Sequence, residues 1–433
     1  KIRYANCKYI YPYFFTMNRL FFLMVFLCFT GSAIGQVIKE TPPPNYIRTV
    51  QLFGENSTNN GNPVIPINGM LNLTFDDIIG DEADYYYQIQ HYDYDWKPTQ
   101  LSKNEYLEGL DDIRIMNYQN SYNTLQPFSH YELSIPNQYT KALKVSGNYM
   151  IKIFNENEEL VFSRKFMIYE AKVSVAPVVK RARDLQFIDT KQVINFTVES
   201  PNLLLRNPEQ TVKPLILQNN NLKTAIKNIK PQYTVGDQLI YRYDMQTSFW
   251  GGNEYLQFDT KDLRATTADI VRVEADQLYH HYLNRDIARA NNPYTYNPDI
   301  NGGFVIRQLD AEDVDTESEY TWIHFSLKNP EPINGGKLHI YGNFNNFTPD
   351  NSTALNYNEE TGYYETARLF KQGYYNYKYI LVNKDGSLDE GFVSGNYDET
   401  ENEYRVLIYY REIGGRYDRI IGMGMTNSKN ISN

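Results

Sequence analysis

Two aspartates lie two positions apart in the segment 85–96, YYYQIQHYDYDW, which also contains a histidine and a tryptophan. On a strand Asp93 and Asp95 would share one face, and paired carboxylates are the groups that general acid–base catalysis requires. The structural interpretation is that they cap the turn at 95–99, DWKPT, while Trp96 fills a core. We favour this interpretation, because no second acidic or nucleophilic element completes the pair. The segment is therefore predicted to be a sheet face, with no catalytic residue.

The six histidines do not have the spacing of a metal site. They are His91, His130, His280, His281, His324 and His339. No two of them are spaced as H-x-x-x-H or H-x-H, the patterns that place two imidazoles on one face of a helix or strand. His280 and His281 would point to opposite faces of a strand. The sequence therefore predicts no zinc site and no metal ligand.

Other motifs that could do chemistry are incomplete. In 391–395, GFVSG, the serine lacks a glycine two positions away on both sides, so the segment is no nucleophile elbow, and no phosphate-binding loop is present. The glycine pair at 422–424, GMG, is expected near a frayed tail. The acidic stretch 309–320, LDAEDVDTESEY, could hold calcium but lacks the spacing and central glycine of a calcium loop, so we expect a solvated linker. We predict no cofactor.

The amino-terminal 35 residues look like an upstream extension followed by an export signal. Met17 is the favoured start, and residues 20–29 form an apolar run that is too short to span a membrane as a helix. Small residues follow this run, so we predict cleavage before Gln36. Cys28 does not fit a lipoprotein signal, because Phe26 and Leu27 precede it directly. We therefore expect an exported chain without a lipid anchor.

Cysteine usage and charge narrow the possible partners. Both cysteines, Cys7 and Cys28, lie in the leader, so the mature chain is expected to be stabilised by buried cores rather than disulfides. The formal net charge is −10, and the leader contributes only basic residues, so the mature chain is still more acidic. Such a chain is a poor ligand for nucleic acid or an anionic membrane surface.

Aromatic residues in an alternating pattern predict an all-β fold. The chain has 39 tyrosines and 22 phenylalanines, residue types that favour strands. In 69–77, GMLNLTFDD, Leu71, Leu73 and Phe75 share one face. No window shows sustained helical periodicity. Strands at this spacing, with glycine-rich turns between them, predict tandem immunoglobulin-like or early-set β-sandwich domains.

Changes in composition suggest where the modules end. Pro177 and the basic segment 180–184 mark one crossing, and the acidic stretch marks another. The predicted organisation is a leader at 1–35, an N-terminal sandwich at 36–177, a middle sandwich at 178–310, an acidic linker at 311–319, a C-terminal early-set-like sandwich at 320–412 and a tail at 413–433.

Several segments together resemble a known family. Residues 92–137, YDYDWKPTQLSKNEYLEGLDDIRIMNYQNSYNTLQPFSHYELSIPN, are followed by SGNYMIKIFN at 146–155 and FSRKFMIYE at 162–170. This order and spacing resemble the amino-terminal region of the plug proteins of the type IX secretion system, formerly a domain-of-unknown-function family. YGNFNNFT, YNEETGYYE and KQGYYNYKYILVN, from 341 to 383, resemble the carboxy-terminal module of that family, which is similar to starch- and glycogen-binding sandwiches.

The resemblance implies a non-enzymatic periplasmic protein. Members would bind the periplasmic end of the large outer-membrane β-barrel translocon of type IX secretion and close its pore while no substrate is engaged. The resemblance implies no cofactor, no small-molecule substrate, and attachment to the outer membrane only through the translocon. Which loops form the partner interface stays open.

A periplasmic carbohydrate-binding or adhesion module of the early-set type is the alternative. Aromatic side chains occupy the positions at which starch-binding relatives present theirs, namely Phe344, Phe347, Tyr363, Tyr364 and Tyr375. The tryptophans that such modules prefer are replaced here by phenylalanine and tyrosine. We therefore expect these side chains to serve a core or an interface rather than a sugar.

Overall fold

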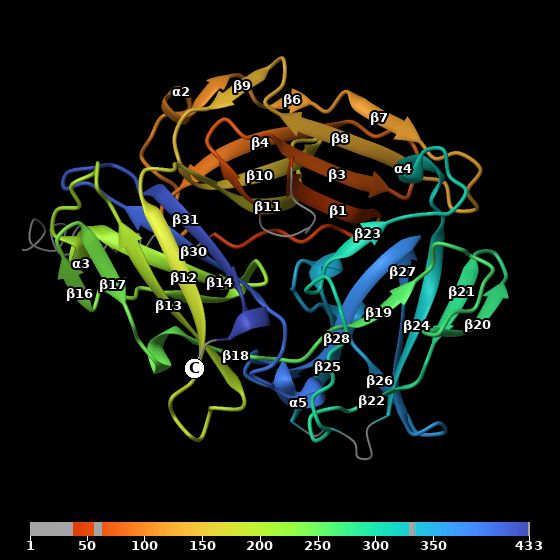
Figure 1. The fold of residues 1–433 in the computed structure, drawn as a ribbon. Helices are drawn as coiled ribbons and strands as arrows, with labels where there is room; N and C mark the ends of the chain where they lie inside the picture. The colour runs from red at the N-terminus through yellow and green to blue at the C-terminus, as the bar shows by residue number, and fades with distance from the viewer. Residues whose placement is uncertain (1–37, 56–62, 329–332, 334, 432–433) are drawn as a thin grey trace, which may run out of the picture. The chain divides into compact units, whose positions relative to one another are not determined.

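Strands make up nearly all regular structure in the residues that the computed structural model describes, 38–55, 63–328, 333 and 335–431. The strands form three groups of sheets (Figure 1), and each group encloses its own hydrophobic core, so the predicted all-β sandwich fold class is confirmed. The predicted signal peptide at 1–35, with Met17 and the cleavage site before Gln36, lies outside these residues.

The first sandwich follows the predicted alternation closely. One sheet has the order β1 (Ile47–Gly54), β3 (Leu71–Asp77), β8 (Ser129–Ile135), β7 (Asn117–Asn120). The other has the order β2 (Val64–Pro66), β11 (Leu160–Tyr169), β10 (Gly147–Asn155), β4 (Tyr85–Tyr92), β6 (Ile113–Arg114). A further pair consists of β5 (Leu107–Gly109) and β9 (Thr140–Leu143). Leu71, Leu73 and Phe75 on β3 are buried in the core between the two sheets, as their spacing predicts.

The second sandwich is assembled from two distant parts of the chain. One sheet has the order β12 (Ser174–Arg181), β13 (Lys191–Glu199), β17 (Gln238–Tyr241), β16 (Tyr233–Val235), and β18 (Ser248–Trp250) also pairs with β13. The other has the order β15 (Asn221–Lys227), β14 (Val212–Gln218), β30 (Glu403–Tyr410), β31 (Arg419–Asn427). Ile216 and Val406, on β14 and β30, lie in the same core.

The third sandwich is inserted between β18 and β30 of the second. In one sheet, β28 (Gly373–Asn383) pairs with β19 (Leu256–Asp259), β23 (Phe304–Ile306), β25 (Gly336–Tyr341) and β29 (Leu388–Asp389). The other has the order β20 (Ile270–Ala275), β21 (Tyr279–Leu283), β24 (Tyr320–Lys328), β27 (Tyr363–Lys371), β26 (Asn356–Asn358), and β22 (Asp286–Ile287) pairs with β24. Phe258, Phe325 and Tyr377 pack in its core.

The sheets correct the predicted module boundaries. The boundary at 177 cuts β12, which belongs to the second sandwich. The module predicted at 178–310 divides between two sandwiches, because β19 pairs with β28 of the third. β30 lies in the module predicted at 320–412 and β31 in the tail predicted at 413–433, but both strands belong to the second sandwich. Strand pairing joins residues that are remote in sequence, so local changes in composition and turn residues do not reveal such an insertion.

The acidic linker predicted at 311–319 is packed against the first sandwich. It contains the one-turn helix α4 (Val314–Glu317), and Ser318 and Glu319 are buried. The Glu319 carboxylate accepts hydrogen bonds from the backbone N–H groups of Leu125 and Gln126, at 2.5 and 3.1 Å. Partners from another part of the chain thus stabilise charges that by sequence alone suggest a solvated segment.

The other α-helices of the described residues are also single turns. They are α2 (Lys103–Tyr106), α3 (Pro208–Thr211) and α5 (Gly391–Ser394). In the part of the chain that the structure covers, no helix has the length and apolarity needed to cross a membrane.

Candidate functional site

One of the two aspartates of the opening segment caps a turn. Asp93 follows β4, and its Oδ1 accepts hydrogen bonds from the backbone N–H groups of Asp95 and Lys97, at 3.0 and 2.9 Å. Asp95 is exposed. This geometry confirms the capping interpretation for Asp93 but not for Asp95.

Trp96 is buried on the side of β4 away from the core, not within it as predicted. Its ring contacts Tyr92, and the Lys165 ammonium lies 4.3 Å from the ring centroid. Tyr92 points away from the core because it alternates with His91, whose ring contacts the core residue Tyr149. The aromatic side chains at this turn therefore lie outside the core of the first sandwich.

Tyr94, in the middle of this turn, joins the first sandwich to the second. Its hydroxyl donates to the Pro214 carbonyl at 2.8 Å and accepts from the Asn228 N–H at 3.0 Å. Its ring packs edge-on against Tyr409, 4.8 Å between centroids. Its backbone N–H donates to Asp418, which also pairs with Arg411. The stretch YDYDW is thus an inter-sandwich joint.

A second contact between the first two sandwiches is ionic. Arg419 on β31 donates two hydrogen bonds to the Glu170 carboxylate, at 3.0 and 2.5 Å. Burial raises the pKa of Glu170, but Arg419, Ser146 and Lys172 together outweigh burial and hold that pKa below its usual value. Bidentate arginine–carboxylate pairs fix orientation as well as distance. Together with Tyr94, this pair restricts rotation between the two sandwiches.

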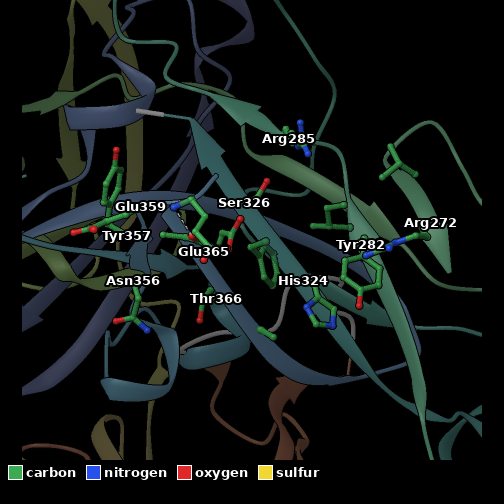
Figure 2. Close-up of a pocket in the computed structure, with 16 residues that line it drawn as sticks. Arg272, Tyr282, Arg285, His324, Ser326, Asn356, Tyr357, Glu359, Glu365 and Thr366 are labelled. Atoms are coloured by element: carbon green, nitrogen blue, oxygen red, sulfur yellow. Dashed lines mark hydrogen bonds between the residues drawn. The ribbon is translucent and has the colours of Figure 1, made fainter. Parts of the chain in front are cut away.

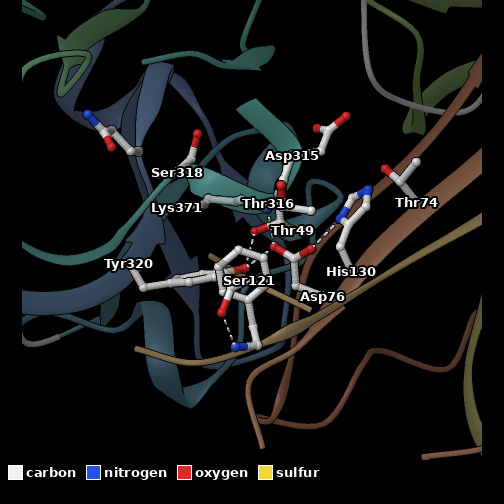
Figure 3. Close-up of polar contacts among 12 residues, drawn as sticks. Thr49, Thr74, Asp76, Ser121, His130, Asp315, Thr316, Ser318, Tyr320 and Lys371 are labelled. Atoms are coloured by element: carbon white, nitrogen blue, oxygen red, sulfur yellow. Dashed lines mark hydrogen bonds and ion pairs between the residues drawn. The ribbon is translucent and has the colours of Figure 1, made fainter. Parts of the chain in front are cut away.

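A fully buried ion pair joins the first sandwich to the third (Figure 3). Asp76 on β3 accepts from the Lys371 ammonium at 2.8 Å and from the Tyr320 hydroxyl at 2.6 Å. On its other side, Asp76 lies 2.5 Å from Nδ1 of His130. Asp76 and Lys371 have side-chain exposures of 0% and 1%. The pair therefore belongs to the interior of the junction.

The electrostatics of this junction favour the ionised carboxylate. Burial by itself raises the pKa of Asp76, but Lys371 and His130 hold that pKa below its ordinary value. Burial and the neighbouring Asp76 raise the pKa of Tyr320 well above normal, so its hydroxyl stays protonated and donates. The Lys371 ammonium also lies 4.2 Å from the Phe128 ring centroid. The junction is thus held by charge as well as by packing.

Buried amides hold the two segments that connect the second and third sandwiches. Gln192 on β13 donates to the carbonyls of Asp398 and Thr400, at 2.6 and 2.7 Å. Asn402 donates to Gln192 at 3.1 Å and to the Gly251 carbonyl at 2.8 Å. Both segments that connect the two sandwiches, 251–255 and 395–402, are therefore tied to the second.

A broad groove lies open on the third sandwich (Figure 2). It has a volume of about 1200 Å³. Its polar lining includes Arg272, Tyr282, His324, Asn356, Glu359 and Glu365. The Arg272 guanidinium lies 3.8 Å from the Tyr282 ring centroid, and His324 stacks on the same ring at 4.2 Å. Because two groups stacked this closely must cover opposite faces, Tyr282 offers no free face on which a sugar could stack.

The aromatic residues weighed for carbohydrate binding largely serve the core. Phe347, Tyr364 and Tyr375 are buried in hydrophobic clusters of the third sandwich, as we expected. Phe344 packs against that core, and Tyr363 is half-buried beneath the guanidinium of Arg285.

The histidines are mostly structural. Burial lowers the pKa of His91 to about 4, and its Nδ1 is 2.9 Å from the Thr99 hydroxyl. His280 and His281 do point to opposite faces of β21: His281 is buried, whereas His280 lies 2.9 Å from His324. Burial also lowers the pKa of His339, which contacts Thr353 at 3.0 Å.

The two glycine motifs are structural as well. In GFVSG, Ser394 is buried and its carbonyl accepts from Asn253 at 2.7 Å. The GMG pair is part of β31 rather than a frayed tail. A Cβ on Gly422 or Gly424 would lie 2.8 or 2.4 Å from backbone oxygens of Val173 and Val175. Glycine at these two positions allows the backbone of residues 173–175 to pack closely on β31.

Known proteins reveal the family of this chain. A solved structure of a hypothetical protein from Parabacteroides merdae is similar over 90% of this chain and 98% of that chain, with 30% sequence identity and a TM-score of 0.85. Residues 47–170 match the family described as the first domain of the type 9 secretion system plug protein. The chain belongs to the type 9 secretion system plug protein family. The matched residues form the first sandwich, and a search of curated proteins gives no match.

Membership of the plug protein family confirms the predicted resemblance. It associates this plug family member with the type 9 secretion machinery and with the periplasm and outer membrane, where that machinery operates. It also favours a structural rather than an enzymatic role.

Proposed function

We propose that this chain is a periplasmic plug subunit, which binds the periplasmic end of the large outer-membrane β-barrel translocon of type IX secretion and closes its pore while no substrate is engaged. The match of residues 47–170 to the plug family carries the proposal. The function needs no cofactor and no catalytic residue, because closure is steric.

Rigidity is the property that a steric plug requires, and the junctions between sandwiches supply it. Buried or partly buried groups link all three pairs of sandwiches: Tyr94 and Glu170, Asp76 with Lys371, and Asn221 with Tyr341. Separating any pair would expose or leave unpaired several buried polar groups, at a cost of about 1–3 kcal/mol for each. Such a body keeps its dimensions while it occupies a pore.

The plug must also leave when a substrate or another subunit needs the pore. An interface of moderate size, rich in polar and aromatic side chains, would allow this exchange by competition. We propose that the chain reaches the periplasm through the predicted signal peptide and is released by cleavage before Gln36. Mass spectrometry of the exported chain tests this, and a retained leader or an N-terminal lipid would contradict it.

The direct test of binding is purification from native membranes through a tag on this chain. The barrel translocon should be recovered with the tagged chain. A tagged periplasmic protein of similar net charge serves as the control for nonspecific electrostatic binding. If the two preparations contain equal amounts of the barrel, the proposed partner is wrong.

A further inference from the structure

A histidine and two carboxylates from distant parts of the chain meet beside the junction of the first and third sandwiches. His130 and Glu132 lie two residues apart on β8, so they share the sheet face opposite the core. Asp315 belongs to α4, in the segment that leads into the third sandwich. One ligand atom from each of the three residues lies within 4.8 Å of the other two. These are ligand types that divalent metal ions bind.

The imidazole of His130 is oriented as metal-binding histidines are. Its Nδ1 lies 2.5 Å from the Asp76 carboxylate, which is ionised beside Lys371 (Figure 3). A carboxylate accepts only, so Nδ1 carries a hydrogen, and in the neutral form of the ring the lone pair is on Nε2. Carboxylate–histidine–metal arrangements fix the tautomer in this way.

The other nitrogen of this ring faces Glu132. His130 is 4% exposed, and its buried Nε2 has no hydrogen-bond partner. Nε2 lies 3.7 Å from Oε1 of Glu132, whose other oxygen accepts from Asn117 at 2.8 Å. Buried polar atoms nearly always have a partner, so this nitrogen is available to a water molecule or an ion.

The net negative charge of the cluster also favours binding of a cation. Asp76, Glu132 and Asp315 are three carboxylates, and the Lys371 ammonium is the positive charge paired with them at Asp76. A divalent ion would bring the sum of these charges to zero. It would lie on the far side of His130 from Asp76, beside the carboxylates of Glu132 and Asp315.

We propose that His130, Glu132 and Asp315 bind a divalent transition-metal cation of the zinc type. Zinc takes nitrogen and carboxylate ligands at about 2.0–2.2 Å and accepts three protein ligands with a fourth position open to water. Small rotations of Glu132 and Asp315 would close the ligand set. The ion would link α4 to β8 and would thereby stabilise the contact between the third sandwich and the first. This metal site goes beyond the plug function proposed above.

Calorimetric titration of Zn²⁺ into the chain, purified without a histidine tag, tests the site. We expect one ion per chain, bound at least about 100-fold more tightly than Mg²⁺, which prefers oxygen ligands. Saturating Zn²⁺ should raise the Tm by at least about 2 °C, because it binds only the folded state. The absence of saturable one-to-one binding would overturn the proposal.

Matched variants locate the ion. Asp315→Asn and Glu132→Gln keep side-chain volume and should each weaken Zn²⁺ binding at least about 10-fold. Asp310→Asn removes the same charge from an exposed position of the same acidic stretch and should leave binding unchanged. Wild-type affinity in both cluster variants, or an equal loss in Asp310→Asn, would place the ion elsewhere. The backbone oxygen of Asp315 that accepts from Lys371 persists in Asp315→Asn, so this variant is expected to fold.

Discussion

Replacing Lys371 with methionine should destabilise the junction of the first and third sandwiches strongly. The substitution removes the ammonium that lies 2.8 Å from the Asp76 carboxylate but keeps much of the side-chain volume. Asp76 is then left buried with only the Tyr320 hydroxyl and His130 as partners. Breaking a buried ion pair in this way costs about 3–5 kcal/mol, because an uncompensated charge remains in the interior.

A double-mutant cycle separates the pair from the packing around it. Asp76→Asn combined with Lys371→Met removes both charges, so the double variant should be more stable than the sum of the single effects predicts, by at least about 1 kcal/mol. Because the folded pKa of Asp76 is below its unfolded value, the contribution of Asp76 is fully present at neutral pH. It is lost as the pH falls through the folded pKa.

Urea unfolding followed by tryptophan fluorescence measures these differences. Lys337→Met is the matched control, because Lys337 is exposed on β25 of the same sandwich, and its free energy of unfolding should change by less than about 0.5 kcal/mol. A loss below about 1 kcal/mol in Lys371→Met, or strict additivity in the cycle, would refute the ionic account of the junction.

Three further predictions concern the joints and cores. Tyr94→Phe removes a hydroxyl that pairs with Pro214 and Asn228, so the free energy of unfolding should fall by about 1–3 kcal/mol in urea, whereas Tyr86→Phe, on a half-exposed ring of the same segment, should change it little. Phe347→Ala and Tyr377→Ala should each cost about 2–4 kcal/mol by calorimetry, and a starch affinity of the wild type would instead support the carbohydrate-binding alternative. Burial lowers the pKa of His91 and of His324 to about 4, so their contribution to stability should be full above about pH 6.5 and decline towards pH 4, and urea midpoints that stay constant across this range would contradict it.

The sequence predicted local structure better than connectivity. The alternation in GMLNLTFDD correctly identified the buried face of β3, because burial on one side of a sheet dictates a period of two. The segment 275–292 is polar in composition and gives no clear strand signal. It nevertheless contains β21, whose alternate residues His281 and Leu283 are buried. The insertion of the third sandwich into the second could not be predicted, because partner strands such as β14 and β30 are separated by the whole insert.

The polar junctions were invisible in the sequence for a related reason. Asp76 precedes its partner Lys371 by nearly three hundred residues, and neither has a distinctive local motif. The spacing of the histidines does not single out His130, because its neighbouring carboxylates, Glu132 and Asp315, come from a strand and a distant one-turn helix. Only the capping role of Asp93 was predictable, because its partners lie within four residues.

The permeability of the outer membrane tests the plug proposal most directly. A strain that lacks this chain should become sensitive to large glycopeptide antibiotics, and removal of the translocon barrel as well should restore resistance, because the hole belongs to the barrel. Asp93→Asn should complement the deletion fully, since asparagine keeps the oxygen that accepts from Asp95 and Lys97. A deletion strain as impermeable as its parent, or a leak that persists without the barrel, would contradict the account.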